Sequence, residues 1–436
     1  MCNRASPLQK PRARFSFDGP HPRTRIPVTR RLLAAALCAA FAACAETSAE
    51  DPAPTAAASA PGMRSTNATA LKLATHATPK PMPAPFDVTE IAQFKEPWAM
   101  ALTHDGYLFV TEKAGTLKRL QFGGAVGDVT GVPAVDYGGQ GGLGDIALHP
   151  GFAENGWIYL SYAEKGEGDT RGAAIARARF VPEGDGGRLE DLKVIWRQSP
   201  KVTGRGHFGH RIRFDALGKL WIGSGEREHF DPAQDMSGNL GKVLRLNDDG
   251  TTPADNPFAG RGDVESTIWS LGHRNPLGFA FDPQGRLWVC EMGPRGGDEL
   301  NLIERGTNYG YPIVSNGDHY DGRDIPDHDK DPAFDPPELW WTPVISPGDM
   351  VFYRGEAFPN WEGDAIIAAL SGKALVRVEI DGATVREAAR YDMGERIRAL
   401  ELAEDGTLYL LEDMKGDAGG RLLRLDPKVT PSMENG

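Results

Sequence analysis

Cysteine is scarce in this sequence. Its 436 residues include only four cysteines, and three of them, Cys2, Cys38 and Cys44, lie within the first 45 residues. The rest of the chain contains Cys290 alone and therefore cannot build a disulfide framework. Core packing or a bound metal must stabilise the fold instead.

Long apolar runs are also missing, because no stretch approaches the roughly 20 residues that a membrane-spanning helix needs. The nearest candidate is residues 32–44, thirteen residues without a charge that follow Arg30 and Arg31. A basic flank, a short apolar segment and small residues at its end are typical of an export signal, which we place at residues 1–45. The paired arginines fit either a twin-arginine signal or an ordinary one.

Two outcomes are open at the end of this signal. Phe41-Ala42-Ala43-Cys44 resembles a lipoprotein cleavage box, in which Cys44 becomes the lipidated first residue, whereas Ala43-Cys44-Ala45 is a small-x-small site that would release a soluble protein. In both cases we expect a periplasmic or secreted protein. Membrane contact is expected only through a lipid on Cys44.

Positive charge is in deficit beyond the signal. The formal charge of the chain is −12, and residues 1–31 contribute +7 to it, which leaves −19 for the remainder. Such an acidic body repels nucleic acid and anionic lipid. A group of arginines within it is therefore expected to meet a small anion.

The remaining sequence divides into a linker and one large domain. Residues 46–85 are rich in Ala, Pro, Thr and Ser and are predicted to form a linker. From residue 86 to about 430, apolar residues alternate with polar ones and show little 3.6-residue periodicity, which indicates an all-β domain.

A turn ending in glycine and followed by an apolar strand recurs within this domain, at Gly106, Gly156, Gly218, Gly285, Gly363 and Gly406. Six copies, separated by 43 to 78 residues, predict a six-bladed β-propeller of four-stranded antiparallel blades. A β-sandwich with similar turns is the alternative. In a propeller, the ligand site is expected where loops from several blades converge at one end of the central channel.

The loop at residues 203–214, TGRGHFGHRIRF, carries two histidines between glycines, and the next strand ends at Glu226. A carboxylate beneath a loop histidine fixes its tautomer and leaves the other ring nitrogen as a general base. The pattern does not decide between His207 and His210, and a satisfied surface histidine is the alternative.

Four other loops are polar and rich in glycine. Gln140 lies among five glycines at residues 138–150, Arg274 and Asn275 precede a proline, and Arg396 and Arg398 alternate on one strand face. An arginine fork suits carboxylate or quinone oxygens, although cross-strand acids would satisfy two aligned arginines equally well. Residues 290–312 combine Gly-Pro with acids and a tyrosine, which is the oxygen chemistry that calcium prefers.

Taken together and in order, these motifs resemble one known family. They are GQGGL with ALHP, HxG with IRF and GKLW, LGKVLRLNDDGTTPADNPF, IWSLGHRNPLG, GPRGGDELN with NYGYP, and GERIRAL. The combination, from about Glu96 to Leu425, is similar to the soluble aldose sugar dehydrogenases that use pyrroloquinoline quinone (PQQ), in the glucose/sorbosone dehydrogenase family. The resemblance implies a six-bladed propeller that binds PQQ beside calcium.

The resemblance also implies roles for individual residues. His207 takes the proton of the sugar's anomeric hydroxyl, and Glu226 supports it. The quinone-contacting positions are Gln140, Arg274, Asn275, Tyr320, Lys373, Arg396 and Arg398. The main-chain oxygens of Gly293 and Pro294 are implied to hold the active-site calcium, and Glu299 and Tyr309 a further calcium.

Several positions depart from the family pattern. Lys373 stands two residues after the expected lysine position, which is Ser371 here. Gly144 replaces a usual leucine, His210 a usual Gly or Ser, and Asp349 interrupts a usual PSGM run. We expect these last three changes to line or approach the channel mouth and to affect substrate preference and cofactor affinity.

The sequence thus predicts an exported quinoprotein that oxidises aldoses to lactones by hydride transfer to PQQ and passes electrons to an external acceptor. Two alternatives stay open. One is a propeller that only binds a ligand, and the other is a calcium-dependent lactonase that uses the same histidine and calcium.

Overall fold

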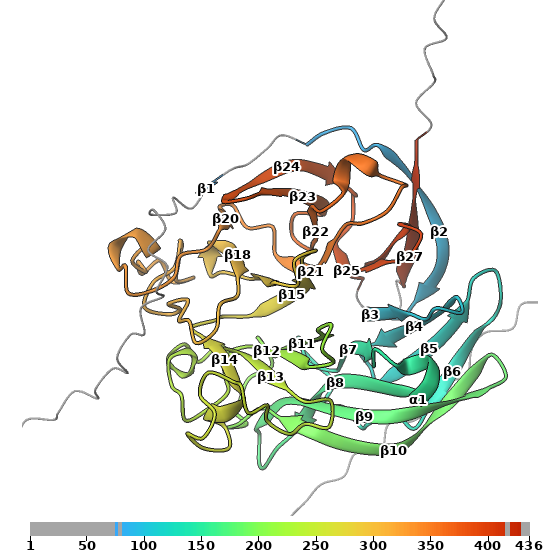
Figure 1. Ribbon diagram of the computed structural model, residues 1–436, viewed down its shortest axis with the longest axis horizontal. Helices are drawn as coiled ribbons and strands as arrows, with labels where there is room; N and C mark the ends of the chain where they lie inside the picture. The colour runs from blue at the N-terminus through green and yellow to red at the C-terminus, as the bar shows by residue number, and fades with distance from the viewer. Residues whose placement is uncertain (1–74, 77–80, 415–418, 429–436) are drawn as a thin grey trace, which may run out of the picture. The chain divides into compact units, whose positions relative to one another are not determined.

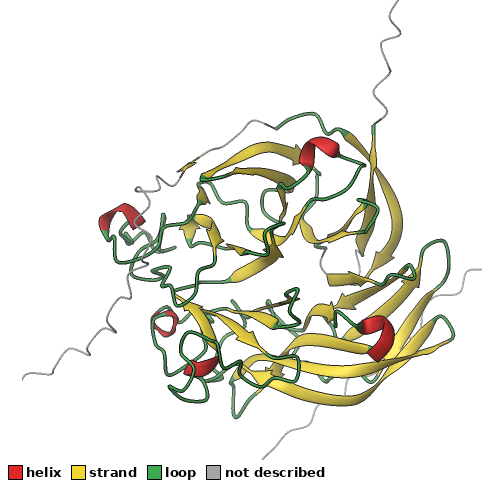
Figure 2. Ribbon diagram, viewed as in Figure 1, coloured by secondary structure: helices red, strands yellow, loops and turns green. Residues whose placement is uncertain are grey.

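β-Strands dominate the structure, a computed structural model that describes residues 75–76, 81–414 and 419–428 (Figure 2). Its helices are α1 (Phe152–Asn155) and the 3₁₀ turns η1 (Asp231–Ala233), η2 (Glu265–Thr267), η3 (His328–Lys330) and η4 (Pro359–Trp361). The prediction of an all-β chain is confirmed. No helix among the described residues is long and apolar enough to cross a membrane.

The predicted export signal at residues 1–45, with Cys44, lies outside the described residues, as does most of the predicted linker. Within the linker range, β1 (Thr75–His76) pairs in parallel with β20 (Leu339–Trp341). β2 begins at Phe86, where the domain was predicted to start.

Three sheets contain four antiparallel strands each. The first consists of β11 (Gly209–Phe214), β12 (Leu220–Ser224), β13 (Lys242–Leu246) and β14 (Ile268–Leu271). The second consists of β21 (Pro347–Phe352), β22 (Ala365–Ala369), β23 (Ala374–Asp381) and β24 (Thr384–Asp392). The third consists of β25 (Ile397–Leu402), β26 (Leu408–Glu412), β27 (Gly420–Pro427) and β2 (Phe86–Phe94).

The other sheets have two, five and eight strands. In the five-stranded sheet, β15 (Pro276–Phe281), β16 (Leu287–Glu291), β18 (Asp298–Leu302) and β20 are antiparallel, and β1 is added at the edge. The two-stranded sheet is β17 (Arg295–Gly296) with β19 (Gly317–Asp318).

The eight-stranded sheet has the order β3-β4-β5-β6-β10-β9-β8-β7. Its strands are β3 (Pro97–Leu102), β4 (Tyr107–Glu112), β5 (Thr116–Gln121), β6 (Val126–Thr130), β7 (Leu143–Leu148), β8 (Trp157–Lys165), β9 (Arg171–Glu183) and β10 (Gly186–Arg197). Neighbours are antiparallel except at the contact of β6 with β10, which is parallel.

The sheets surround a centre lined by β3, β7, β11, β15, β21 and β25 (Figure 1). Each of these strands contacts the next in this order, and β25 contacts β3, so that they close a ring. Apolar cores fill the space between neighbouring sheets, as where Trp288 and Trp341 pack with Ile367 and Val376. The arrangement is propeller-like, and β2, paired along its length with β27, joins the two ends of the domain in one sheet.

The six recurring glycines share one position in this ring. Each precedes the second strand of its set, as Gly106 precedes β4 and Gly406 precedes β26. All six have positive φ, between 69° and 85°. The repeated phrase in the sequence therefore marks the turn that leads outward from an inner strand, at which glycine adopts the left-handed backbone without strain.

A buried charged network occupies the centre of the ring. The guanidinium of Arg211 on β11 donates to Asp145 Oδ1 on β7 (3.0 Å), to the Leu277 carbonyl on β15 (2.7 Å) and to the Gly348 carbonyl on β21 (2.5 Å). It also lies 4.4 Å from the ring centroid of Trp98 on β3. Arg211 and Asp145 are fully buried.

Asp349 extends this network to the last inner strand. It accepts from Arg213 at 3.0 Å, lies 3.6 Å from Arg211, and accepts the backbone N–H of Leu400 on β25 at 3.1 Å. Asp349 was expected to line or approach the channel mouth, and its carboxylate is held inside the ring by two arginines.

We expect Arg211→Met to lower the free energy of unfolding by about 3–5 kcal/mol, because two buried carboxylates, Asp145 and Asp349, would each lose one of their two arginine partners. Arg188→Met is the matched control, since Arg188 is 40% exposed in its pairs with Glu183 and Glu190 and should change stability by less than about 1 kcal/mol. Denaturant unfolding of both variants measures the difference. Equal effects would show that the central network does not stabilise the ring.

Candidate active site

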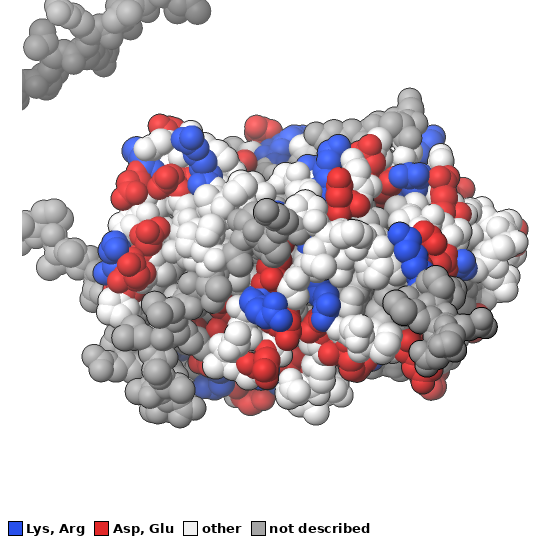
Figure 3. Space-filling view, turned by 90° about the horizontal axis from the view of Figure 1, so that it is seen from above, with Lys and Arg blue, Asp and Glu red and all other residues white. Residues whose placement is uncertain are grey.

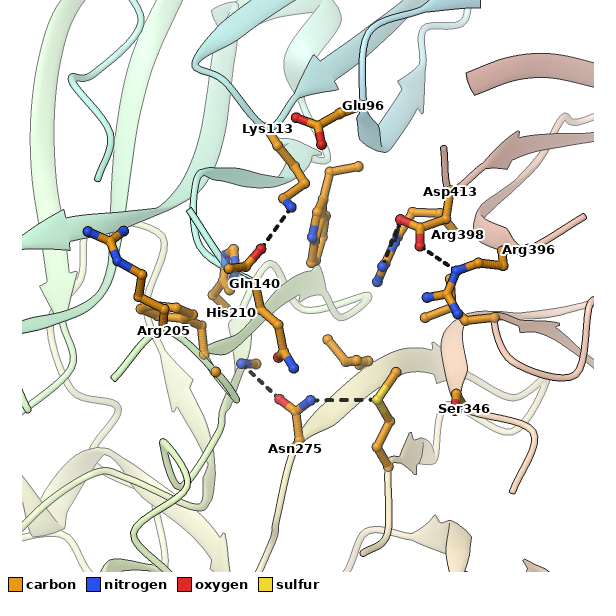
Figure 4. A pocket seen from close by; sticks show the side chains of 18 of the residues that line it. Glu96, Lys113, Gln140, Arg205, His210, Asn275, Ser346, Arg396, Arg398 and Asp413 are labelled. Atoms are coloured by element: carbon orange, nitrogen blue, oxygen red, sulfur yellow. Dashed lines mark hydrogen bonds and ion pairs between the residues drawn. The ribbon is translucent and has the colours of Figure 1, made fainter. Parts of the chain in front are cut away.

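A cavity of about 560 Å³ lies where the inner strands of the ring begin (Figure 4). It is lined by Glu96, Trp98, Lys113, Gly139, Gln140, Arg205, Gly206, Phe208, Gly209, His210, Glu228, Asn275, Leu277, Met292, Ser346, Leu370, Arg396, Arg398, Asp413 and Met414. These residues come from loops far apart in the sequence. The ring brings them together because its inner strands start at the same end.

Four of the predicted site residues line this cavity: Gln140, Asn275, Arg396 and Arg398. His210, one of the two candidate bases, lines it as well. Of the others, His207 donates its backbone N–H to the lining residue Gln140, and Arg274 donates to the carbonyl of the lining residue Met292.

The cavity carries four basic side chains, Lys113, Arg205, Arg396 and Arg398, against three acidic ones, Glu96, Glu228 and Asp413. The surface in Figure 3, by contrast, shows acidic and basic side chains interspersed without a broad basic area. In a body of net negative charge, this small excess of cations suits a small anion.

Asp413 holds the two predicted arginines side by side. Its carboxylate accepts from Arg396 Nε (2.8 Å) and from Arg398 Nε and Nη2 (3.0 and 2.9 Å). Burial alone would raise the pKa of Asp413, but the charges and hydrogen bonds of the two arginines outweigh it and lower the pKa to about 2. The carboxylate is thus ionised at any working pH.

Asp413 was not predicted from the sequence, although a signal was present. Asp413 directly follows β26, which pairs antiparallel with β25, so it lies opposite Arg396. Trp98, Lys113 and Arg205 were not predicted either. The sequence gives no comparable signal for them, because each comes from a different loop or strand.

His207 is oriented by a buried acid. Its Nδ1 lies 2.5 Å from Glu226 Oε1, and the backbone N–H of His207 donates to Gln140 Oε1 at 2.9 Å. The other carboxylate oxygen of Glu226 accepts the backbone N–H groups of His229 (2.6 Å) and Phe230 (2.8 Å). Burial would raise the pKa of Glu226, but the hydrogen bond and charge of His207 and the N–H of Phe230 lower it.

An ionised Glu226 therefore holds the proton of His207 on Nδ1 and leaves Nε2 as a proton acceptor. The surroundings of His210 are opposite in character. Burial, followed by the positive charges of Arg211, Arg227, Arg398 and Lys113, lowers the pKa of His210 to about 3. Such an imidazole is a poor proton acceptor near neutral pH, so the geometry favours His207 as the base.

Arg274 and Asn275 connect the cavity to the loop after β16. Asn275 Oδ1 accepts the N–H of Gly209 at 3.1 Å, beside the two histidines. Arg274 Nη1 donates to the carbonyls of Met292 (2.9 Å) and Gly293 (2.6 Å). Its guanidinium is 5.8 Å from the ring centroid of Tyr320, which is 74% exposed.

Lys373 does not line the cavity. Its Nζ donates to the carbonyl of Gly394 (3.0 Å) and lies 3.7 Å from Glu395. Lys113 is the lysine that the structure places at the cavity, where its Nζ donates to the Gly139 carbonyl at 3.0 Å.

Glu299 and Tyr309, predicted to hold a calcium, meet through His328. His328 Nε2 lies 3.1 Å from the Tyr309 carbonyl, and its Nδ1 is 4.0 Å from Glu299. Burial and then the negative charge of Glu291 raise the pKa of Glu299 well above its usual range. Asn301 Oδ1 is buried here and has no hydrogen-bond partner among the residues that the structure describes. Carboxyl, carbonyl and amide oxygens gathered in a buried place are the ligands that a hard cation prefers.

Side-chain clusters that form a metal site by themselves were not found, since no group of three His, Cys, Asp or Glu residues in the described part of the chain could hold a metal ion. Main-chain oxygens, such as those predicted at Gly293 and Pro294, would have to contribute.

Comparison with known proteins identifies relatives over the whole domain. The family model for glucose/sorbosone dehydrogenases matches residues 94–424. The aldose sugar dehydrogenase YliI of Escherichia coli is 38% identical over 348 residues, covering 78% of this chain and 92% of that protein.

Solved structures show the same relationship. The apo form of the soluble aldose sugar dehydrogenase from Escherichia coli superposes with a TM-score of 0.75 at 36% identity, over 79% of this chain and all of that one. The PQQ-bound aldose sugar dehydrogenase from Streptomyces coelicolor superposes with a TM-score of 0.66 at 28% identity, over 80% of this chain and 99% of that one.

Asp413→Asn tests the arginine clamp through pH. The folded protein holds the pKa of Asp413 at about 2, below the usual 3.8, so its stabilising effect is full above about pH 4 and is lost as the pH falls toward 2. We expect the variant to be about 2 kcal/mol less stable than the wild type near pH 6, and the difference to shrink near pH 3. Urea unfolding across this range measures it, and a constant difference would contradict the clamp.

Proposed function

The chain belongs to the glucose/sorbosone dehydrogenase family, and on that premise we propose that it is a quinoprotein oxidoreductase that oxidises aldose sugars at C1 to lactones. The observation that carries the proposal is the pair of His207 and Glu226, with Nδ1 bound to a buried carboxylate, beside a cavity suited to a flat anion. The relatives are named as aldose sugar dehydrogenases, and one was solved with PQQ.

We infer a six-bladed propeller as the scaffold. Dividing the eight-stranded sheet where β6 meets β10 in parallel gives two sets of four antiparallel strands. With the other four large sheets, and with β1 taken as an addition to one edge, the sets number six. The closed ring of six inner strands supports this division.

The cavity residues fit PQQ, a flat tricarboxylate. Gln140 and Asn275 both line the cavity and offer amide groups at its edges. Arg396 and Arg398 present cations for carboxylates. When bound, the quinone would supply the acceptor for the hydride that leaves C1 of the sugar.

The chain's own groups would manage the proton. Glu226 Oε1 accepts the Nδ1 proton of His207, so Nε2 takes the proton of the anomeric hydroxyl as the C1–H bond breaks. The positive charge that then develops on His207 is stabilised by the ionised Glu226, which two backbone N–H groups hold in place. The sugar loses one hydride and one proton, which gives the lactone.

We also propose that calcium is bound by the main-chain oxygens of Gly293 and Pro294 and, at a second place, by Glu299 and Tyr309. Arg274, which holds the Gly293 carbonyl, links the first of these places to the cavity through its neighbour Asn275. Bound calcium would polarise a quinone oxygen. The buried and unpaired Asn301 Oδ1 beside Glu299 supports the second place.

We propose a periplasmic or secreted location, on the basis of the signal pattern at residues 1–45. Electrons would then pass to an external acceptor outside the cytoplasm. Anchoring to a membrane would depend on lipidation at Cys44, which intact-mass analysis of the mature protein would detect.

The proposal is tested on the purified apo-protein by titration with PQQ and calcium, followed by a dye-linked assay on a panel of aldoses. We expect uptake of about one quinone per chain and dye reduction with at least one aldose. Lactone hydrolysis without quinone uptake would favour the lactonase instead. Neither activity nor quinone binding would leave only a ligand-binding propeller.

His207→Ala and Glu226→Gln test the base. Each should lower kcat by about 10²–10⁴-fold, because the first removes the proton acceptor and the second removes the anion that stabilises its charge. Quinone affinity should stay within about three-fold of the wild type. His229→Ala is the matched control, since its exposed side chain is lost while its backbone N–H still holds Glu226. Turnover retained in His207→Ala would reassign the base.

A further inference from the structure

His210 has one ring nitrogen bound to the protein and the other facing the cavity. The residue is 2% exposed, and its ring stacks on Trp98 with centroids 5.0 Å apart and planes inclined by 26°. Nδ1 lies 2.9 Å from Ser161 Oγ. Nε2 makes no hydrogen bond to any described residue, yet it is not among the fully buried unpaired polar atoms. It therefore opens onto the cavity that His210 lines (Figure 4).

The hydrogen bonds of Ser161 indicate which nitrogen carries the proton. Ser161 Oγ accepts the backbone N–H of Asp145 at 2.7 Å, and among the described residues His210 Nδ1 is the one acceptor within reach of its own hydroxyl proton, which would otherwise be buried without a partner. Nδ1 is then the acceptor, and the ring proton lies on Nε2. Since burial and neighbouring positive charges lower the pKa of His210 to about 3, the ring stays neutral and Nε2 stays a donor throughout the neutral pH range.

Neighbouring residues fix the position of the His210 ring. A Cβ on Gly144 would overlap Cε1 and Nδ1 of His210, so the ring occupies space that any side chain at position 144 would need. The left-handed backbone of His210, with φ of 51°, directs the ring there at a cost in strain. Phe208, in a T-shaped contact, and the stacked ring of Trp98 hold it from two further sides.

We propose that His210 binds the quinone cofactor by donating its Nε2–H to one of the oxygen atoms of that flat anion. This inference rests on the proposed function and adds to it a binding residue that serves as a donor only. The two histidines of the loop then have different chemical roles. His207 accepts a proton through Nε2, and His210 offers one in a hydrogen bond from Nε2 without releasing it.

The test is calorimetric titration of the calcium-supplied apo-protein with PQQ, so that binding is measured without turnover. His210→Ala should bind PQQ about ten-fold more weakly, which is the effect of losing one hydrogen bond to a ligand. His210→Gln keeps an uncharged N–H donor and should stay within about three-fold of the wild type. The ratio of wild-type to His210→Ala affinity should be constant from about pH 5 to pH 8, because a neutral donor does not titrate there.

A second pair of variants separates binding from folding. Gly144→Ala should displace the ring, lowering both the melting temperature and the affinity for PQQ. Adding His210→Gly removes the overlap, so the double variant should recover the melting temperature but keep the roughly ten-fold loss of affinity. Recovery of both would show that His210 acts only by filling space and would overturn the inference.

The outcomes also distinguish this inference from the proposed function. A wild-type protein that takes up no PQQ would overturn the proposed function, and the role of His210 with it. Normal uptake by the wild type with equal affinity in His210→Ala would overturn the role of His210 alone. A ratio of affinities that grows as the pH falls would indicate a charged His210 and would also contradict it.

Discussion

The geometry of the site depends on the contacts that the guanidinium of Arg211 makes with the inner strands. It sits in the centre of the ring and touches or bonds residues of β3, β7, β15 and β21, while its partner Asp349 reaches β25. A buried charge of this kind is tolerated only when every partner is in place. The network therefore fixes the relative positions of the inner strands, and the cavity lies where those strands begin.

Arg211 also immediately follows His210 in the sequence. Its contacts at the centre of the ring therefore fix the position of the end of the loop that carries the two histidines. His207 and His210 are three residues apart, but β11 begins between them, and their rings face different environments. The ring of His207 is bound to the negatively charged carboxylate of Glu226, whereas the ring of His210 lies near several positive charges. One short segment thus supplies a proton acceptor and a neutral group of fixed protonation state.

Much of this organisation could be predicted from the sequence. The six turn glycines, the all-β pattern and the loop motifs are local signals, and the pairing of a loop histidine with Glu226 follows from a strand that ends near a loop. The choice of His207 over His210 came from the family resemblance. Contacts between distant loops could not be predicted in this way. Lys113 reaches the cavity instead of Lys373, and Asp349 lies in the central network, because both depend on how the ring closes.

Asp413 has two opposite effects on the cavity: it orders Arg396 and Arg398, and it neutralises part of their positive charge. Two arginines on one strand face repel each other, and Asp413 forms ion pairs with both of them at the cavity. Because the two arginines are already ordered, less conformational entropy is lost when a ligand binds. The negative charge of Asp413 also cancels part of the attraction for an anion. A ligand with several carboxylates gains most from such a site, because it meets cations already in position and can engage them together.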